Sequence, residues 1–315
     1  MILVTGGAGF IGSNLVERLL ADGEDVVIFD NFSSGRRAFI EGLSEEGSSR
    51  VRVVEGDLLD TRAIEHLFEE FEIDFVYHLA ANPEVRIGVD DPGVHLEQNV
   101  ITTYNLLEGM RRHGIREIAF TSTSTVYGEA ALIPTPEEYG PLIPISTYGA
   151  SKLASEALIT SYTHTFDMRA WIFRFANVVG KRGTHGVIFD FIRKLRANPR
   201  ELEILGDGRQ EKSYMLVDDC IDGMLFAIRK ARDPVNIFNL GSKDTINVTR
   251  IAEIVVEQMD LKNVTFRYTG GARGWKGDVP RMMLAIDAIR NLGWEPRFSS
   301  EESVRAATRY LLGSE

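Results

Sequence analysis

A tyrosine and a lysine four residues apart, Tyr148 and Lys152, form the pair best suited to chemistry in this chain. Of the nine tyrosines, only Tyr148 has a lysine at this spacing. On a helix the two side chains share a face. A free phenol has a pKa of about 10, and a nearby ammonium lowers it by favouring the phenolate. The pair therefore predicts a general base, although an ordinary pair of helix residues has the same spacing.

Glycines spaced G-x-x-G-x-x-G lie between an apolar run at residues 2–4 and an amphipathic stretch at 10–21. Between a strand and a helix, such glycines permit a tight turn, a close approach to a pyrophosphate and close packing of the helix. The positive end of the helix favours the phosphates. The loop predicts a dinucleotide site. Its expected contacts are Gly6, Gly9, Phe10, Ile11 and Gly12.

Asp30 ends the next apolar run, at residues 26–30. A carboxylate at this place accepts both hydroxyls of an adenosine ribose and repels a 2′-phosphate, which favours NAD over NADP. The alternative is a strand-end carboxylate that caps the following turn.

Composition excludes several functions for the 315 residues. The net charge of −11 argues against nucleic acid or an anionic membrane as partner. Cys220 is the single cysteine, which fits a reducing compartment, so we expect a cytoplasmic protein. The six histidines are not spaced as metal ligands, so no metal is expected. No apolar run approaches the roughly 20 residues of a membrane span.

Strand and helix patterns alternate through the first half of the chain, which predicts a doubly wound parallel α/β sheet. The expected strands are residues 2–4, 26–30, 51–55, 75–79, 117–122 and 169–174. The expected helices are 10–21, 61–72, 94–113 and 148–165. Beyond residue 177 the pattern loosens, with helices at 187–195 and 304–312 and a strand at 237–241 that rejoins the sheet. We therefore expect an NAD-binding Rossmann domain at 1–178 plus about 216–241, and a smaller α+β lobe at 179–215 plus 242–315.

The chain resembles the extended short-chain dehydrogenase/reductase family, and within it the UDP-glucose 4-epimerases. The resemblance rests on the glycine loop, Asp30-Asn31, His78-Leu79-Ala80-Ala81, Asn99, Tyr148-x-x-x-Lys152 and Arg174-Phe175-Ala176-Asn177. It covers nearly the whole chain, and it implies that the smaller lobe, at 179–215 plus 242–315, binds a nucleotide sugar. It adds to the cofactor contacts Asn31, Asp57, Leu58, Leu79, Ala80, Ala81 and Asn99, together with Tyr148 and Lys152. His78 and Asn99 are interpreted as mainly structural.

The resemblance places the catalytic hydroxyl at Thr123, with Ser122 and Ser124 as nearby hydroxyls. Related 4,6-dehydratases carry Asp-Glu at the places of Ser124 and Thr125, and glucuronate decarboxylases carry a glutamate at the place of Thr125. This chain has no carboxylate there. A ketone formed at the sugar C4 can then only be reduced again, which implies epimerisation.

Substrate contacts implied by the resemblance are Asn177, Val187, Lys212, Arg273 and Asp278. Lys212 replaces the family's pyrophosphate-binding arginine and loses its bidentate fork. Trp275 stands where relatives often have arginine, which leaves Arg273 as the alternative phosphate ligand. A residue near Met282 is expected to line the sugar pocket.

The leading interpretation is an NAD-dependent UDP-glucose/UDP-galactose 4-epimerase that acts through a transient 4-keto sugar. Epimerases of UDP-glucuronate or UDP-N-acetylglucosamine remain open, as do a net NAD-dependent oxidoreductase and a non-catalytic NAD sensor. The helices at 94–113 and 148–165 are the surfaces through which relatives pair, so a homodimer is expected; the alternative is that their apolar faces belong to the core.

Overall fold

The computed structural model describes residues 1–46, 50–275 and 277–313. The chain divides into two compact units. The first unit comprises Met1–Gly128, Pro141–Arg174 and Ala227–Phe238, and the second comprises Glu129–Gly140, Phe175–Phe226 and Asn239–Glu315. The domain boundaries expected from the sequence stay a prediction.

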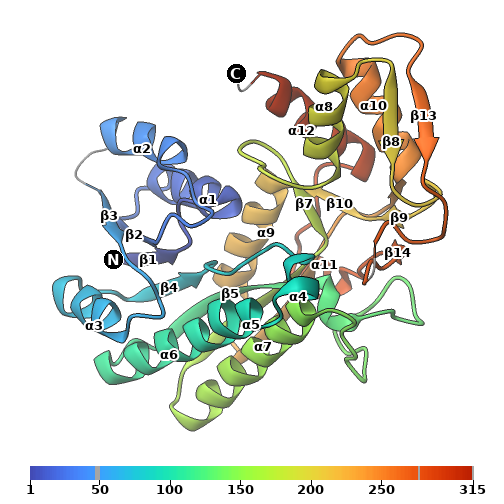
Figure 1. The fold of residues 1–315 in the computed structure, drawn as a ribbon. Helices are drawn as coiled ribbons and strands as arrows, with labels where there is room; N and C mark the ends of the chain where they lie inside the picture. The colour runs from blue at the N-terminus through green and yellow to red at the C-terminus, as the bar shows by residue number, and fades with distance from the viewer. Residues whose placement is uncertain (47–49, 276, 314–315) are drawn as a thin grey trace. The chain divides into compact units, whose positions relative to one another are not determined.

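The first unit is organised around a twisted parallel sheet (Figure 1). Among the described residues, seven strands follow the order β11-β6-β5-β4-β1-β2-β3. Ile2 of β1 pairs with Val26 of β2 on one side and with Phe75 of β4 on the other. The strand order therefore reverses at β1, and the predicted doubly wound sheet is confirmed. The strands are β1 (Ile2–Thr5), β2 (Val26–Asp30), β3 (Val51–Glu55), β4 (Phe75–His78), β5 (Glu117–Thr123), β6 (Arg169–Phe175) and β11 (Val235–Leu240).

Helices α3, α6 and α7 pack on one face of this sheet, where α6 lies between the other two (Figure 1). Their apolar stripes meet strand residues such as Leu3 and Ile118 in one buried cluster. The helix expected at 94–113 contains a π-helical stretch, η2 (Leu96–Ile101), before α6. The other elements are α1 (Phe10–Ala21), η1 (Arg37–Phe39), α2 (Glu41–Glu46), α3 (Thr61–Glu70), α4 (Ile87–Asp90), α5 (Gly93–His95), α6 (Thr102–His113), η3 (Ser124–Tyr127) and α7 (Thr147–Thr165).

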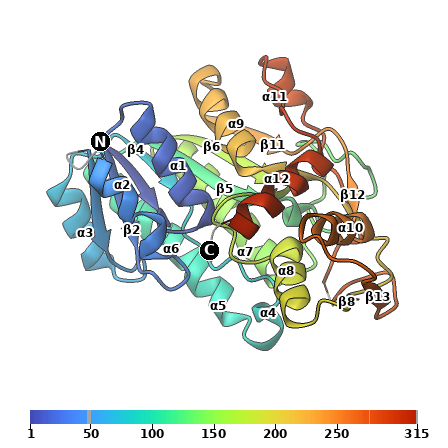
Figure 2. The ribbon, with the colours of Figure 1, turned by 90° about the horizontal axis from the view of Figure 1, so that it is seen from above.

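The second unit contains helices α8, α10 and α12 packed on short strands, with α12 beside α10 (Figure 2). Its strands are two to four residues long, too short to show alternation, and the sequence pattern missed all of them. Helices α9 and α10 were also missed. The elements are β7 (Asn177–Val179), α8 (Val187–Ala197), β8 (Glu201–Ile204), β9 (Glu211–Lys212), β10 (Tyr214–Leu216), α9 (Val217–Lys230), β12 (Ile246–Asn247), α10 (Val248–Gln258), β13 (Thr265–Tyr268), β14 (Arg281–Met282), α11 (Asp287–Asn291) and α12 (Ser300–Gly313).

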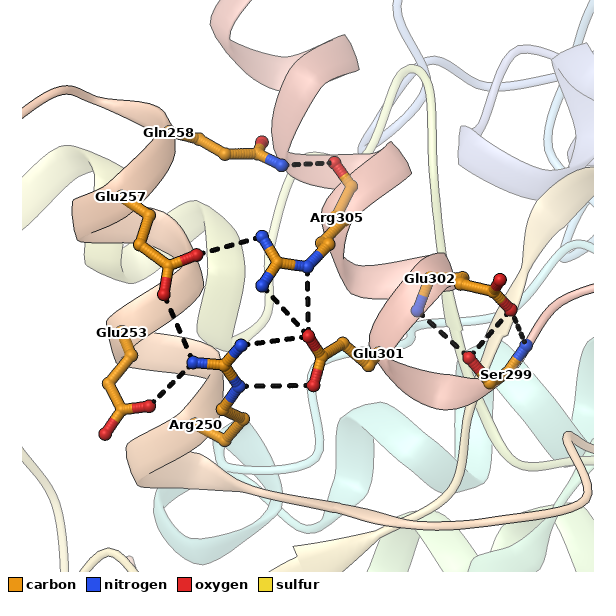
Figure 3. Close-up of polar contacts among 8 residues, drawn as sticks. All are labelled: Arg250, Glu253, Glu257, Gln258, Ser299, Glu301, Glu302 and Arg305. Carbon is orange, nitrogen blue, oxygen red and sulfur yellow. Dashed lines mark hydrogen bonds and ion pairs between the residues drawn. The ribbon is translucent and has the colours of Figure 1, made fainter.

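An ion-pair network joins α10 to α12 (Figure 3). Arg250 of α10 donates to both carboxylate oxygens of Glu301, at 3.1 and 2.9 Å, and Arg305 of α12 reaches Glu257 at 2.9 Å. Networks of this kind stabilise more than isolated surface pairs do. No helix in the described part of the chain combines the length and the apolar character that a membrane span requires.

Candidate active site

The glycine loop lies against the chain that follows β4, and its shape requires glycine. Gly6 has a φ of +69°, and a Cβ added there would lie 2.7 Å from the backbone nitrogen of Ala80. A Cβ added at Gly12 would lie 2.1 Å from the Gly6 carbonyl oxygen. Helix α1 begins at Phe10, and its N-cap residue, Gly9, offers no side-chain cap. The loop thus presents a bare helix start at the point where the strand order reverses, which suits a pyrophosphate.

Asp30 is held rigidly at the end of β2. Its Oδ2 accepts from the Ala8 amide at 2.9 Å and its Oδ1 from the Phe32 amide at 2.8 Å. A Cβ on Gly35 would lie 2.8 Å from Oδ1, so only glycine fits beside the carboxylate. Burial raises the pKa of Asp30, and the two amide hydrogen bonds oppose that shift. Each oxygen retains acceptor capacity for a ribose hydroxyl. These features fit an adenosine ribose.

Two further groups of predicted cofactor residues flank the loop. Asn31 donates to the carboxylate of Asp57 at 2.9 Å, and Leu58 is buried beside it in sequence. Leu79 and Ala80 donate their amides to Thr5, at 3.1 and 3.3 Å. Both groups therefore follow the carboxyl ends of strands near β1, where open α/β sheets bind ligands. Ala81 follows Ala80 directly and is half-buried.

His78 and Asn99 make structural contacts. The ring nitrogens of His78 lie 2.8 Å from the hydroxyl of Thr5 and 3.0 Å from that of Thr103. Burial, together with the charge of Lys152, lowers the pKa of His78 to about 3. Asn99 lies in the π-helical η2 and donates to Ser151 of α7 at 2.8 Å. His78 thus connects β4 to β1 and α6, and Asn99 connects η2 to α7.

Tyr148 meets Thr123 because the start of α7 approaches the end of β5 closely. Ser146 caps α7 by accepting from the Gly149 amide at 3.0 Å. A Cβ on Gly149 would lie 2.8 Å from the carbonyl oxygen of Thr125, so glycine permits the approach. This brings the hydroxyl of Thr123, the last residue of β5, close enough to that of Tyr148 to lower the pKa of the tyrosine.

The neighbouring hydroxyls have other roles. Ser122 is buried and donates to the carboxylate of Glu156. Thr123 Oγ1 accepts from both the amide and the hydroxyl of Thr125, each at 3.2 Å. A hydroxyl that accepts twice has its own hydrogen left to donate. Thr123 is therefore poised as a donor to Tyr148.

The pKa of Tyr148 differs from the expectation. Burial raises it to about 12, and the hydrogen bond with Thr123 only partly offsets this. Burial also lowers the pKa of Lys152 to about 7, while Glu156 opposes the shift. The Lys152 ammonium lies 4.2 Å from the centre of the Phe120 ring, and among the described residues it has no hydrogen-bond acceptor. The expected lowering of the tyrosine pKa by Lys152 is therefore wrong for these side chains, because burial outweighs it.

The predicted phosphate ligands of the second unit are brought together. Lys212 of β9 donates to Asp278 Oδ1 at 2.5 Å, and Arg273 donates to the Asp278 carbonyl at 2.7 Å. Arg273 also donates to the carboxylate of Glu129 at 2.5 Å, a partner that the sequence did not reveal.

Asn177 and Val187 lie on other elements of the second unit. Asn177 starts β7 and donates to the Ser213 carbonyl at 3.2 Å. Val187 is the half-buried first residue of α8.

Sequence reasoning also missed Glu156 and Arg174 as partners. Their signal was available in part, because Glu156 continues the four-residue spacing of Tyr148 and Lys152. In the part of the chain that the structure describes, no group of three His, Cys, Asp or Glu side chains is placed to hold a metal ion.

Comparison with known proteins identifies the family. Residues 2–241 match the model of the NAD dependent epimerase/dehydratase family. The chain is 40% identical to a UDP-glucose 4-epimerase of Mycolicibacterium smegmatis, over 98% of this chain and 97% of that protein. It is 30% identical to a UDP-glucuronate 4-epimerase of Thermodesulfobacterium geofontis, over 98% and 95%. A crystal structure of a UDP-galactose 4-epimerase superposes with a TM-score of 0.88 at 42% identity, over 99% of both chains. The chain belongs to the NAD dependent epimerase/dehydratase family of enzymes, and its cofactor is NAD.

Proposed function

We propose that this enzyme inverts the configuration at C4 of a UDP-hexose and interconverts UDP-glucose and UDP-galactose. The observation that carries the proposal is the interacting hydroxyl pair Thr123 and Tyr148, followed by hydroxyl side chains, and no carboxylate, at Ser124 and Thr125. A dehydratase or decarboxylase needs a carboxylate at these places to move a proton at a sugar carbon. The 40% and 42% identical relatives, both named as 4-epimerases, support the same reaction.

In the proposed mechanism Tyr148, as phenolate, takes the proton of the sugar 4-hydroxyl. Bound NAD supplies the hydride acceptor at C4 and, in its oxidised form, a positively charged ring. That charge and the Lys152 ammonium favour the phenolate, against the burial that raises the pKa of Tyr148. Thr123 donates a hydrogen bond that orients the reacting oxygen. After the 4-keto sugar turns over, Tyr148 returns the proton to the 4-oxygen.

The proposed nucleotide ligands belong to the second unit. Lys212 and Arg273 supply positive charge for the diphosphate, and each is held in place by Asp278. Asn177 and Val187 are proposed to contact the substrate as well. Met282 pairs with Lys212 across β14 and β9, so its flexible side chain lies beside a phosphate ligand. Substitution of Met282 is therefore expected to change whether the enzyme accepts an N-acetylated sugar.

The test is incubation with UDP-glucose, UDP-galactose, UDP-glucuronate and UDP-N-acetylglucosamine, with products identified by NMR. We expect interconversion of the first two without added NAD, because the cofactor is regenerated in each cycle. Selective turnover of UDP-glucuronate or UDP-N-acetylglucosamine would transfer the assignment to that sugar. Stoichiometric consumption of external NAD would identify a net oxidoreductase instead. A protein that binds NAD but turns over no sugar in the panel would be a sensor.

We also propose a cytoplasmic homodimer. Leu96, Ile101 and Tyr104, on the helical stretch formed by η2 and α6, are 56, 39 and 45% exposed. Such apolar side chains on one stretch favour a partner surface. Light scattering coupled to size exclusion measures the mass, and a monomer at micromolar concentration contradicts the dimer.

A further inference from the structure

A buried ion pair lies behind the proton-transfer residues of the first unit. Arg174, near the end of β6, and Glu156, on α7, have side chains only 5% exposed. The guanidinium donates to the carboxylate of Glu156 through two nitrogens. Nε lies 3.1 and 3.3 Å from the two carboxylate oxygens, and Nη2 lies 2.8 Å from Oε2. Bidentate pairs of this kind have a fixed geometry. The pair therefore joins β6 to α7 in one defined arrangement.

The same pair fixes both ends of the segment that carries Thr123. Ser122, the residue before it, donates to Glu156. Tyr127, which ends η3, accepts from Arg174 Nη1 at 2.9 Å. Because one anchor precedes Thr123 and the other follows it, the position of its hydroxyl is set by the ion pair.

Glu156 also acts on Lys152, one helical turn earlier on α7. Lys152 is 2% exposed, and burial disfavours its charge. On α7, Tyr148 precedes Lys152 by one turn and Glu156 follows it by one turn; the charge of Glu156 acts on Lys152, and His78 on β4, which also interacts with Lys152, is kept neutral by its own burial. Arg174 of β6 lies beyond the carboxylate. Glu156 is thus the neighbouring charge that favours the ammonium.

We propose that Glu156 and Arg174 are positioning residues for proton transfer: their ion pair holds the end of β5 against α7 so that Thr123 meets Tyr148, and the Glu156 carboxylate sustains the charge of Lys152. This inference rests on the roles proposed for those three residues. Stability alone does not require the pair, because apolar residues of similar volume are often as stabilising as a buried ion pair.

Two variants separate positioning from folding. Glu156→Gln removes the carboxylate charge and leaves Arg174 buried without its counter-ion, which costs stability. The double variant Glu156→Leu/Arg174→Met removes both charges and restores apolar packing, so it is expected to fold. Glu117→Gln is the matched control. It breaks another Glu–Arg pair between β5 and β6, in which Arg169 Nη1 lies 2.7 Å from Glu117.

We expect the folded double variant to retain bound NAD and to lose roughly 10²-fold in kcat, with a smaller change in KM, as a misplaced reacting group does. In Glu156→Gln, Lys152 loses its proton at lower pH and Tyr148 at higher pH. The fraction of enzyme in which Lys152 is protonated and Tyr148 is ionised should therefore fall, and with it the rate at the pH optimum. Glu156→Asp should recover part of the rate, and Glu117→Gln should match the wild type. A folded double variant with wild-type kcat and pH profile would overturn the proposal.

A readout without sugar keeps this inference separate from the proposed function. The tyrosinate absorbance of the NAD-bound enzyme, minus that of its Tyr148→Phe counterpart, follows the ionisation of Tyr148. The apparent pKa should rise in Glu156→Gln, because the Thr123 hydrogen bond and the Lys152 charge are both weakened. An unchanged titration overturns the positioning role. Failure of the wild type to turn over any UDP-sugar overturns the proposed function alone.

Discussion

The hydroxyl of Thr123 interacts with that of Tyr148 and lowers the pKa of the tyrosine, which burial nevertheless raises to about 12. The contact joins the last residue of β5 to the first turn of α7. It places a donor against the phenol oxygen that we propose to carry negative charge during proton transfer. The relationship makes the role of Tyr148 directly testable.

Tyr148→Phe should lower kcat by roughly 10²-fold or more, on the usual scale of general acid–base catalysis. Bound NAD should remain, measured by release on denaturation. Tyr162→Phe is the control, because Tyr162 is on the same helix but bonds to Glu108, at 2.6 Å. Near-normal turnover by Tyr148→Phe would contradict the assigned role.

Lys152→Met should abolish turnover and yet raise the melting temperature of the NAD-depleted protein at pH 7. The pKa of Lys152 falls from 10.5 to about 7 on burial, so the folded state holds this proton less tightly than the unfolded state. Stability of the wild type therefore rises with pH between about 7 and 10.5. The melting gain should exceed about 2 °C. A lower melting temperature, or a gain that does not shrink towards pH 10, would exclude this account.

Asp30→Asn should weaken NAD binding by about tenfold or more, because hydrogen bonds to a charged acceptor are worth roughly 1.5–3 kcal/mol. It should also improve binding of NADP relative to NAD, since the negative charge is lost. Titration calorimetry measures both. Asp60→Asn serves as control, because asparagine also caps α3, where Asp60 accepts from the Arg62 amide. Equal loss in both variants would point to a general effect on folding.

Gly12→Ala should prevent NAD binding and destabilise the first unit, because its Cβ would lie 2.1 Å from the Gly6 carbonyl oxygen. Gly42→Ala is the matched control on α2, where an added Cβ meets nothing within 4 Å. There alanine should be neutral or stabilise by roughly 0.5–1 kcal/mol. Thermal unfolding and NAD content distinguish the two. A Gly12→Ala protein with full NAD content would show that the loop backbone can shift to accommodate the added Cβ.

Glu301→Gln should reduce stability at neutral pH but not at acidic pH. Hydrogen bonds from Arg250 and Arg305 lower the pKa of Glu301 from 4.5 to about 2 (Figure 3). Its contribution is therefore present above about pH 4.5 and is lost as the pH falls through 2. Glu301 is 41% exposed, so solvent screening keeps the effect small. Urea unfolding at several pH values checks this, and a difference that persists at pH 2 would contradict the network's role.

The sequence by itself determined the local parts of this enzyme. The glycine spacing, Asp30 at a strand end and the Tyr148–Lys152 interval are short-range patterns, and strand–helix alternation fixes the parallel sheet through local periodicity. The apolar run that forms β11 was likewise recognised from its local pattern as a strand of the sheet. Each of these features needs only residues within a few turns of one another.

Tertiary structure decided the rest. Burial, which no local pattern states, sets the pKa values of Tyr148 and Lys152 against expectation. Packing also gives the Ser122 hydroxyl a partner, Glu156, that no sequence pattern indicated. The partners of Arg174 and Arg273 come from distant segments, and a charged residue gives no sign in sequence of which opposite charge it will meet. The sequence supplies the chemical groups, and folding determines which groups lie next to one another and which of them are charged.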